Sequence, residues 1–375
     1  MISGFPNTEF YMKYRHLAVG DVIENMTINT TFGSDFDLDL LSGRHVALYF
    51  VGGLDDDAGR TALARLKRLP AFDGKSALLL IVVCGAAREH PDAPKSRGCA
   101  YIFDSDLKVS KYFGAVPELV GPSQSVPFRR TVHVLNPRLQ VSKIFDLDQL
   151  DAAEKHLSGL DDPGSFMGFE VFAPILIIPN VFENELCTLL IEQHSREERA
   201  ITGAMRRDGN RTVGVVDARH KVRRDFFVED QQILDVISNR FRRRVKPEIK
   251  KVHQFEVTRI ERNLVGCYTA EDGGHFRAHR DNTTPVTAHR KFALSINLND
   301  DFDGGEVGFP EYGNRSYRAP AGGALVFSCS LLHCVSKVSR GARYAYLPFL
   351  YDAEGSRLRA ANIHSLSGAS FEPAS

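Results

Sequence analysis

The chain has 375 residues, which is long for one domain and comfortable for two. Its 47 Lys and Arg residues balance 47 Asp and Glu residues, so no global field favours nucleic acid or an anionic membrane. No apolar run approaches the roughly 20 residues that span a bilayer, and residues 1–16 lack the apolar core of a signal peptide. We therefore expect a cytoplasmic protein without nucleic-acid or membrane partners.

The first part of the chain alternates between apolar strands and helical stretches. Strands are predicted at Val46–Phe50, Ala77–Val83 and Thr131–Leu135, and a helix over Asp57–Arg68. The run Ala77–Val83 is apolar throughout, which is typical of a strand covered on both faces. Strands that alternate with helices predict an α/β domain over residues 1–158.

The second part has a different pattern. Residues 159–170 carry Gly, Pro, Ser and Asp without periodicity, so they are predicted to be a linker. Residues 171–354 include a helix over Glu229–Val245, which Pro247 is expected to end, and then become rich in strands. Glycine turns divide these strands, as in a double-stranded β-helix, or jelly roll, with flanking helices. Residues 355–375 are predicted to form a polar, disordered tail.

His279 and Asp281 are the first candidate metal ligands. Residues two apart in a strand point to the same face, so these two side chains can hold one ion together. His333, from a distant strand, would complete a set of two imidazoles and one carboxylate. That set leaves coordination positions open and is typical of non-haem Fe(II) oxygenases. The sequence therefore predicts an iron site made by these three residues.

Arg343 follows His333 by about ten residues, in the alternating run Arg343–Leu347. Its planar guanidinium can hold a carboxylate through two parallel hydrogen bonds. A co-substrate acid such as 2-oxoglutarate needs such a partner, so we expect Arg343 to anchor it.

Three segments, in chain order, resemble the catalytic core of the 2-oxoglutarate/Fe(II) dioxygenases, and most closely their prolyl-4-hydroxylase-like branch. They are CYTAEDGGHFRAHRDN, LSINLNDDFDGGEVGFPEYG and LLHCVSKVSRGARYAYLPFLYD. The resemblance covers roughly residues 170–352. It implies Fe(II), 2-oxoglutarate and O2 as cofactors, with ascorbate as a supporting reductant, and hydroxylation of an unactivated C–H bond with release of succinate and CO2. Halogenating relatives have a small residue in place of the carboxylate, so Asp281 favours hydroxylation.

The substrate implied by the resemblance stays open. It is a prolyl or other residue of a protein or peptide, or a free amino acid or natural-product intermediate, because substrate choice depends on loops. Tyr268 matches a tyrosine that hydrogen-bonds the co-substrate, with core packing as the alternative, and Asn297 lies on a strand whose inward side can face the co-substrate. Arg277 is expected on the face of His279, two residues later. The candidate substrate contacts are Arg277, Arg280 and Asn282.

Residues 17–158 resemble the peroxiredoxin branch of the thioredoxin fold, through LAVGD, LSGRHVALYF, FDSDLKVSKYFGAV and RRTVHVLNP. That family has its reactive cysteine shortly after the strand matching Val46–Phe50, where this chain reads VGGLDDDAGRTA. A thiol peroxidase needs a thiolate of low pKa, so we expect a redox-inactive domain that serves as scaffold, substrate clamp or surface for a homo-oligomer. Two alternatives stay open: a thiol peroxidase using Cys84 or Cys99, and a non-catalytic binding or scaffold protein with a vestigial iron site.

Overall fold

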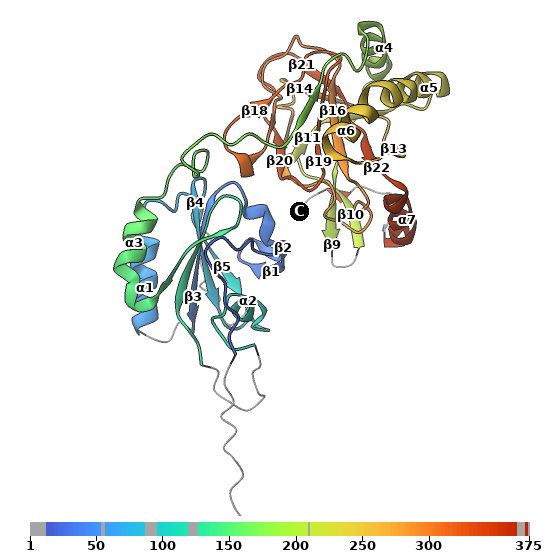
Figure 1. Ribbon diagram of the computed structural model, residues 1–375. Helices are drawn as coiled ribbons and strands as arrows, with labels where there is room; N and C mark the ends of the chain where they lie inside the picture. The colour runs from blue at the N-terminus through green and yellow to red at the C-terminus, as the bar shows by residue number, and fades with distance from the viewer. Residues whose placement is uncertain are drawn as a thin grey trace, which may run out of the picture. The chain divides into compact units, whose positions relative to one another are not determined.

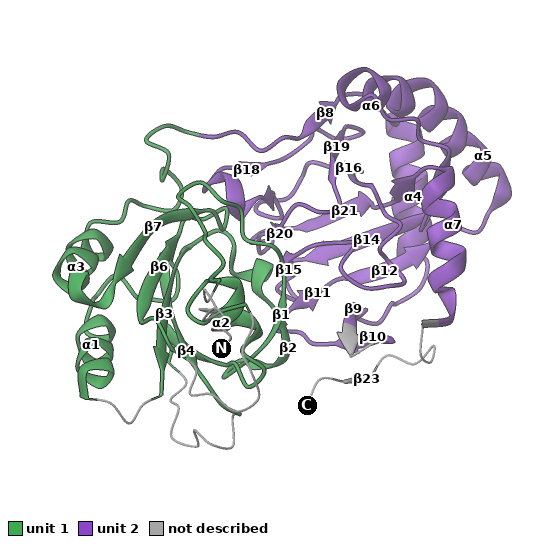
Figure 2. Ribbon diagram, turned by 60° about the horizontal axis from the view of Figure 1, so that its bottom comes forward, with its two compact units in different colours: residues 1–170 green, residues 171–375 purple. Residues whose placement is uncertain are grey.

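The computed structural model describes residues 13–53, 57–86, 96–118, 127–208, 211–365 and 372–373. The chain divides into two compact units, residues 1–170 and 171–375, which Figure 2 shows in green and purple. The division falls at the end of the predicted linker. Within the described ranges, no helix is both long and apolar enough to cross a membrane.

A seven-stranded sheet forms the centre of the first unit (Figure 1). Its strands are β1 Thr27–Thr30, β2 Gly33–Asp37, β3 His45–Gly52, β4 Ala77–Val83, β5 Cys99–Phe103, β6 Thr131–Leu135 and β7 Val141–Asp146. They lie in the order β2-β1-β5-β4-β3-β6-β7. β3, β4 and β5 are parallel, β6 is antiparallel to β3, and β7 is antiparallel to β6. The order β4-β3-β6-β7 with these directions is the thioredoxin-like arrangement, so the predicted α/β fold is confirmed.

Helices cover both faces of this sheet. α1 (Asp57–Lys67) and α3 (Leu150–Ser158) lie on one face, and α2 (Lys108–Tyr112) lies on the other (Figures 1 and 2). Because successive strand residues point to opposite faces, Tyr49 packs among the α1 and α3 side chains and Phe50 among those near α2. Both side chains are fully buried. Short 3-10 turns occupy Leu38–Leu41 and Leu147–Gln149.

Two facing sheets make the second unit a jelly roll. The smaller sheet contains, in order, β11 Lys221–Val222, β15 His275–His279, β20 His333–Val335, β17 Val307–Gly308 and β18 Ser316–Tyr317. The larger sheet contains β12 Arg224–Phe227, β14 Leu264–Thr269, β21 Ala342–Tyr346, β16 Phe292–Asn297, β19 Ala324–Ser328 and β8 Leu176–Ile178, with β13 Arg259–Glu261 and β22 Phe349–Tyr351 beside this path. A separate small sheet is made by β9 Ala204–Asp208, β10 Arg211–Val216 and β23 Glu372–Pro373.

Helices cover the outer face of the larger sheet (Figure 2). They are α4 Asn184–Ser195, α5 Gln231–Arg240, a π-helical turn Phe241–Val245 and α6 Lys246–His253. α7 Ala353–Asn362 follows β22, and 3-10 turns occupy Pro310–Tyr312 and Ile363–Ser365. Leu190, Ile237 and Ile249 bury their side chains in one cluster with Val326 of β19. This cluster is the main apolar core of the unit.

Two helical predictions were wrong. Pro247 does not end the helix that precedes it, because the chain passes through the π turn into α6 and places Pro247 in the first turn. Proline is accepted there since the first N–H groups of a helix have no partner within it. The predicted tail is helical over residues 355–365. α7 begins after Asp352, whose side chain accepts a hydrogen bond from the Gly355 N–H at 2.7 Å. Residues 366–371 and 374–375 lie outside the described residues.

Strand alternation directs a set of polar side chains between the two sheets. In β16, Leu294 and Ile296 pack under the helices, so the residues between and after them face inward. In β14, Tyr268 packs against Val335 of the smaller sheet. The inward-facing polar residues of the larger sheet include Tyr268, Ser295, Asn297 and Arg343.

Candidate metal centre

His279, Asp281 and His333 lie together at one end of the smaller sheet. His279 ends β15 and pairs across the ladder with His333, the first residue of β20. The Nε2 atoms of His279 and His333 lie 3.5 and 3.3 Å from the two carboxylate oxygens of Asp281. All three ligand atoms lie within 4.8 Å of one another. The structure therefore brings the three predicted ligands into one group.

A β-bulge sits immediately before the ligands. Phe276 pairs with Val335 and His279 pairs with His333, so three steps along β15 match two steps along β20. The bulge puts the Phe276 ring against the His279 ring, with centroids 3.6 Å apart and the planes 18° apart. Alternation therefore does not carry from Arg277 to His279, and Arg277 is exposed. Its contact with substrate stays a prediction that strand alternation does not support.

The tautomers of both ligand histidines are set by backbone carbonyls. His279 Nδ1 lies 2.8 Å from the Arg277 carbonyl oxygen, and His333 Nδ1 lies 3.0 Å from the Leu331 carbonyl oxygen. A carbonyl can only accept, so each Nδ1 carries the hydrogen and each Nε2 keeps its lone pair. This arrangement orients metal-binding histidines.

The charges at the site favour a bound cation. Burial acts to raise the pKa of Asp281, but His333 and His279 outweigh it and hold the pKa well below its usual range. Burial, with the neighbouring His279, lowers the pKa of His333 to about 4. At neutral pH the site offers an ionised carboxylate and a neutral imidazole at His333. A set of two imidazoles and one carboxylate fits Fe(II).

A buried cluster of charged side chains contacts the main chain of Asp281. Arg290 donates to the Asp281 carbonyl oxygen at 3.3 Å and to Glu261 Oε1 at 2.5 Å. His289 Nε2 lies 2.8 Å from Glu261 Oε2. Burial opposes ionisation of Glu261, but His289 and Arg290 lower its pKa to about 2. This cluster was missed in the sequence, because nothing in the local pattern links Glu261 to residues 28 and 29 positions away.

Arg343 has an unused hydrogen-bond donor in the interior. Its side chain is 2% exposed, and it donates through Nε to Asn297 Oδ1 at 3.0 Å and through Nη2 to Ser295 Oγ at 2.6 Å. Nη1 is buried and has no partner within the described part of the chain. Burial lowers the pKa of Arg343 to about 10, which leaves it charged at neutral pH. A buried cation with a free donor fits a carboxylate ligand such as that of 2-oxoglutarate.

The glycine pair of the DFDGGE segment makes room for this arginine. Gly305 has φ +65°, and a Cβ there would lie 2.9 Å from Arg343 Cδ. Gly304 has φ +73°, and a Cβ there would lie 2.2 Å from the Lys337 carbonyl oxygen. Both positions therefore need glycine for conformation and for space.

The other predicted site residues divide into two groups. Asn297 holds Arg343, and Tyr268 lies beside it in the ladder with its hydroxyl oxygen 3.3 Å from Arg223 Nη1. Two candidate substrate contacts are engaged within the protein instead. Arg280 donates to Glu311 Oε1 at 2.9 Å, and Asn282 donates to Ser330 Oγ at 2.8 Å. Substrate contact by Arg280 and Asn282 stays a prediction.

The thiols of the first unit lack the property that a peroxidase requires. Burial, together with Asp104, raises the pKa of Cys84 to about 11. Burial also raises the pKa of Cys99. Both thiols are therefore protonated at neutral pH, whereas a peroxidatic cysteine reacts as a thiolate. This argues against the thiol-peroxidase alternative.

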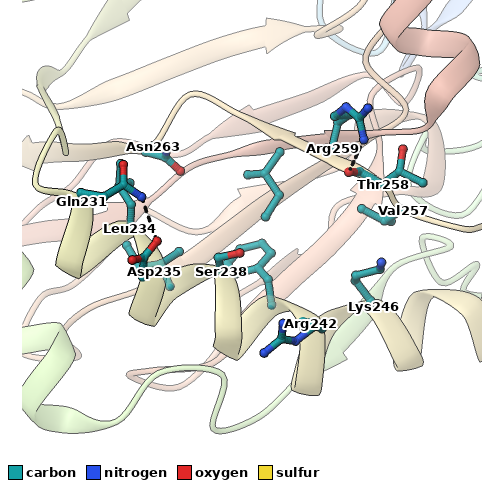
Figure 3. Close-up of a pocket in the computed structure, with 13 residues that line it drawn as sticks. Gln231, Leu234, Asp235, Ser238, Arg242, Lys246, Val257, Thr258, Arg259 and Asn263 are labelled. Atoms are coloured by element: carbon teal, nitrogen blue, oxygen red, sulfur yellow. Dashed lines mark hydrogen bonds between the residues drawn. The ribbon is translucent and has the colours of Figure 1, made fainter.

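A cavity of about 390 Å³ lies elsewhere in the second unit, between α5, α6 and β13 (Figure 3). Its polar side chains partly pair with one another, as Gln231 Nε2 does with Asp235 Oδ1 at 2.8 Å. None of the predicted site residues lines it. The cavity is therefore separate from the metal centre.

Comparison with known proteins covers part of the chain. Residues 264–351 match the family model described as the 2OG-Fe(II) oxygenase superfamily. A PKHD-type hydroxylase of Synechococcus sp. (strain JA-2-3B'a(2-13)) is 29% identical over an alignment of 118 residues that covers 26% of this chain and 52% of the relative. The chain thus spans about half the length of such relatives.

Two solved structures are each similar to a part of the chain. A prolyl hydroxylase of Trichoplax adhaerens, in complex with a hypoxia inducible factor oxygen degradation domain peptide fragment, is 16% identical and covers 50% of this chain and 86% of that chain, with a TM-score of 0.36. The bacterioferritin comigratory protein of Xanthomonas campestris is 21% identical and covers 35% and 89%, with a TM-score of 0.30. At these values the structural likenesses add no argument of their own, so the fold of each unit rests on its strand order.

The resemblance to the 2-oxoglutarate/Fe(II) dioxygenases is confirmed over residues 264–351. That segment contains the three candidate ligands and also Arg343. It is the part of this chain that is similar to the 2OG-Fe(II) oxygenase superfamily.

Proposed function

We propose that the second unit is an Fe(II)- and 2-oxoglutarate-dependent dioxygenase that hydroxylates an unactivated C–H bond and releases succinate and CO2. The observation that carries the proposal is the pairing, inside one jelly roll, of a metal-ligand triad with a buried arginine whose Nη1 has no partner among the described residues. The triad suits the iron, and the arginine suits the carboxylate of the co-substrate. A vestigial iron site would have no need to keep the ligand triad or the buried arginine intact.

Each side chain has a definite task in this function. Iron, with 2-oxoglutarate and O2, would supply the oxidising power, and ascorbate would support it as a reductant. His279, Asp281 and His333 would hold the metal ion. Arg343 holds the distal carboxylate, and Asn297 and Ser295 fix the direction of its guanidinium. The apolar residues between the sheets exclude water from the reaction.

The substrate class is the least constrained part of the proposal. We propose an amino-acid-type substrate, as the resemblance in the sequence implies. It is a prolyl or other residue in a protein or peptide, or a free amino acid or natural-product intermediate. A homo-oligomer formed through the first unit is a further expectation. Both questions can be addressed once the chemistry of the metal centre is established.

The decisive experiment is an anaerobic titration of the purified chain. Fe(II) is added first and 2-oxoglutarate second, and the weak visible charge-transfer band of the ternary complex is recorded. We expect the band in the wild type and its complete loss in His279→Ala, with His275→Ala, on the same strand, as the matched control that keeps it. Arg343→Met should keep iron and weaken 2-oxoglutarate binding by about 100-fold. A folded wild type that binds no iron would exclude the proposal and leave a binding or scaffold protein.

A further inference from the structure

A second buried arginine of the jelly roll contacts Tyr268, the residue paired with Arg343. Arg223 lies between β11 and β12 and is 6% exposed. Its stem passes over Gly266 of β14, where a Cβ would lie 2.7 Å from Arg223 Cδ. Glycine at that position gives this side chain its space.

Arg223 is held in one orientation by Asp225. It donates to Asp225 Oδ1 through Nε at 2.5 Å and to Oδ2 through Nη2 at 2.9 Å. Asp225 is itself buried and also accepts from Thr202 Oγ1 at 2.6 Å and from Lys221 Nζ at 3.3 Å. The bidentate pair leaves Nη1 of Arg223 to point elsewhere. It points at the hydroxyl oxygen of Tyr268, 3.3 Å away.

The contact with Arg223 determines which hydrogen-bond role remains for the Tyr268 hydroxyl. A guanidinium has no acceptor, so Arg223 must donate and the phenolic oxygen must accept. The hydroxyl hydrogen of Tyr268 is then free to donate to something else. No acceptor for it is present within the ranges that the structure describes, although Tyr268 is 1% exposed.

Tyr268 lies directly beside Arg343. The two residues are paired across β14 and β21, and the Arg343 guanidinium carbon lies 5.4 Å from the Tyr268 ring centroid. Arg343 Nη1 is the other buried donor here without a described partner. The Tyr268 hydroxyl and Arg343 Nη1 are therefore two neighbouring donors without acceptors, beside the positive charge of the Arg343 guanidinium. Such a pair suits the two oxygens of one carboxylate.

We propose that Arg223 is a positioning residue for 2-oxoglutarate, because it occupies the acceptor side of the Tyr268 hydroxyl and so directs the hydroxyl hydrogen at the distal carboxylate held by Arg343. This inference rests on the proposed function, since it presupposes that 2-oxoglutarate binds at Arg343. Arg223 does not touch the co-substrate. It acts through Tyr268.

The test is calorimetric titration of 2-oxoglutarate into the full chain loaded with Mn(II), which occupies the metal site without turnover. We compare Tyr268→Phe, the paired change Arg223→Met with Asp225→Asn, and all three changes together. The double replacement removes the Arg223–Asp225 ion pair as a whole. Lys221, which also donates to Asp225, keeps two other acceptors, Thr202 Oγ1 and the Gly203 carbonyl oxygen, each at 2.8 Å. Tyr268→Phe and the paired change should each weaken 2-oxoglutarate binding by roughly ten-fold or more. The triple change should be no worse than either, because both remove the same hydrogen bond.

The matched control is the neighbouring pair, Arg224 with Asp272. It has the same bidentate geometry, at 2.8 and 2.9 Å, but does not reach Tyr268. Arg224→Met with Asp272→Asn should leave the 2-oxoglutarate affinity unchanged. Mn(II) affinity should be unchanged in every variant, which separates positioning of the co-substrate from general loosening of the fold.

The possible failures are distinguishable. If wild-type protein binds Mn(II) but not 2-oxoglutarate, the proposed function is wrong. The proposed role of Arg223 is overturned, while the proposed function stands, in two cases where the wild type binds 2-oxoglutarate. In the first, the paired change of Arg223 and Asp225 leaves the 2-oxoglutarate affinity unchanged. In the second, its loss of affinity adds to the loss caused by Tyr268→Phe. Should the paired change prevent folding, Tyr268→Phe still decides, because unchanged affinity in that variant removes the route through which Arg223 would act.

Discussion

The two units bury an unsatisfied nitrogen in very different surroundings. In the first unit, His133 Nδ1 has no partner among the described residues, and its ring lies between Phe50 and Phe113 at centroid distances of 5.4 and 5.3 Å. In the second unit, Arg343 Nη1 also has no described partner, but its guanidinium is charged and is oriented by two other polar side chains. The His133 imidazole is neutral and packs against apolar core residues. The Arg343 guanidinium is a cation whose orientation is fixed by two hydrogen bonds.

This difference separates a structural residue from a site residue. Leaving a neutral imidazole nitrogen unpaired has a modest cost, which tight apolar packing can offset. Leaving a buried cation unpaired costs far more unless a ligand supplies the missing charge. The fold of the first unit therefore needs no ligand at His133, whereas the second unit keeps a position that an anion would complete.

The largest expected effect is on the ion cluster behind the metal ligands. Glu261→Gln removes the negative charge that Arg290 and His289 share, so we expect the second unit to lose about 3–5 kcal/mol of unfolding free energy. Urea unfolding followed by circular dichroism measures this loss. Asp303→Asn is the matched control, because its partner Arg340 and Asp303 are 65% and 56% exposed, and it should change stability by no more than about 0.5 kcal/mol. Equal effects of the two variants would contradict the assigned role of burial.

The next effect concerns the pH dependence of the first unit. Burial lowers the pKa of His133 to about 4, whereas the same residue in an unfolded chain has its ordinary pKa of 6.5. Between these values only the unfolded chain takes up the proton, so the unfolding free energy falls as the pH is lowered from 6.5 to about 4, by up to about 3 kcal/mol. His133→Phe should remove the contribution of His133 to this dependence and leave that of His45 and His156, whose pKa values burial also lowers. Urea unfolding at about pH 7 and about pH 4.5 measures it.

His16→Gln provides the control for that experiment, since His16 is exposed. This variant should keep the pH dependence of the wild type. If His133→Phe also keeps it, the acid sensitivity comes from another group, and the contrast between His133 and Arg343 loses its support.

The smallest expected effect is at Cys84. With its pKa raised to about 11, the thiol should be alkylated by iodoacetamide at neutral pH roughly 100-fold more slowly than an ordinary cysteine with a pKa of 9.0, because the thiolate is the reactive form. Mass spectrometry of the native protein measures the rate. Cys84→Ser with Cys99→Ser should leave peroxide consumption unchanged. Peroxide consumption that these substitutions abolish would revive the thiol-peroxidase alternative.

Site residues could be predicted from the sequence where the residue types suit the chemistry and also follow the chain order of the resembling family. His279 and Asp281 are close in the chain, and His333 and Arg343 follow in the order of the resembling family, so all four were named from the sequence. Local strands such as β4 were predicted with their bounds because an unbroken apolar run leaves little choice. In both cases the signal lies within a few residues.

The parts that were missed depend on contacts between distant strands. Arg223 and Glu261 lie outside the three segments that carry the resemblance, and Ser295 lies in one of them without a recognisable role. Only the register of the folded sheets places Ser295 beside Arg343. The β-bulge in β15 could not be predicted from the sequence either. Because of it, Arg277 and His279 do not follow the strand alternation that was expected for them. Most of α7, Ala353–Asn362, falls within the predicted tail, because the helix is polar on most of its surface and its start depends on one cap at Asp352.

The carbonyl partners of the two ligand histidines have a consequence for how the site can vary over evolution. Each Nδ1 hydrogen bond ends on main-chain oxygen, of Arg277 and of Leu331, which every amino acid carries. Side chains at those two positions can therefore change without altering the tautomer of either ligand. Mutational drift can reshape the rim of the site for a new substrate while the donor atoms for the metal stay as they are.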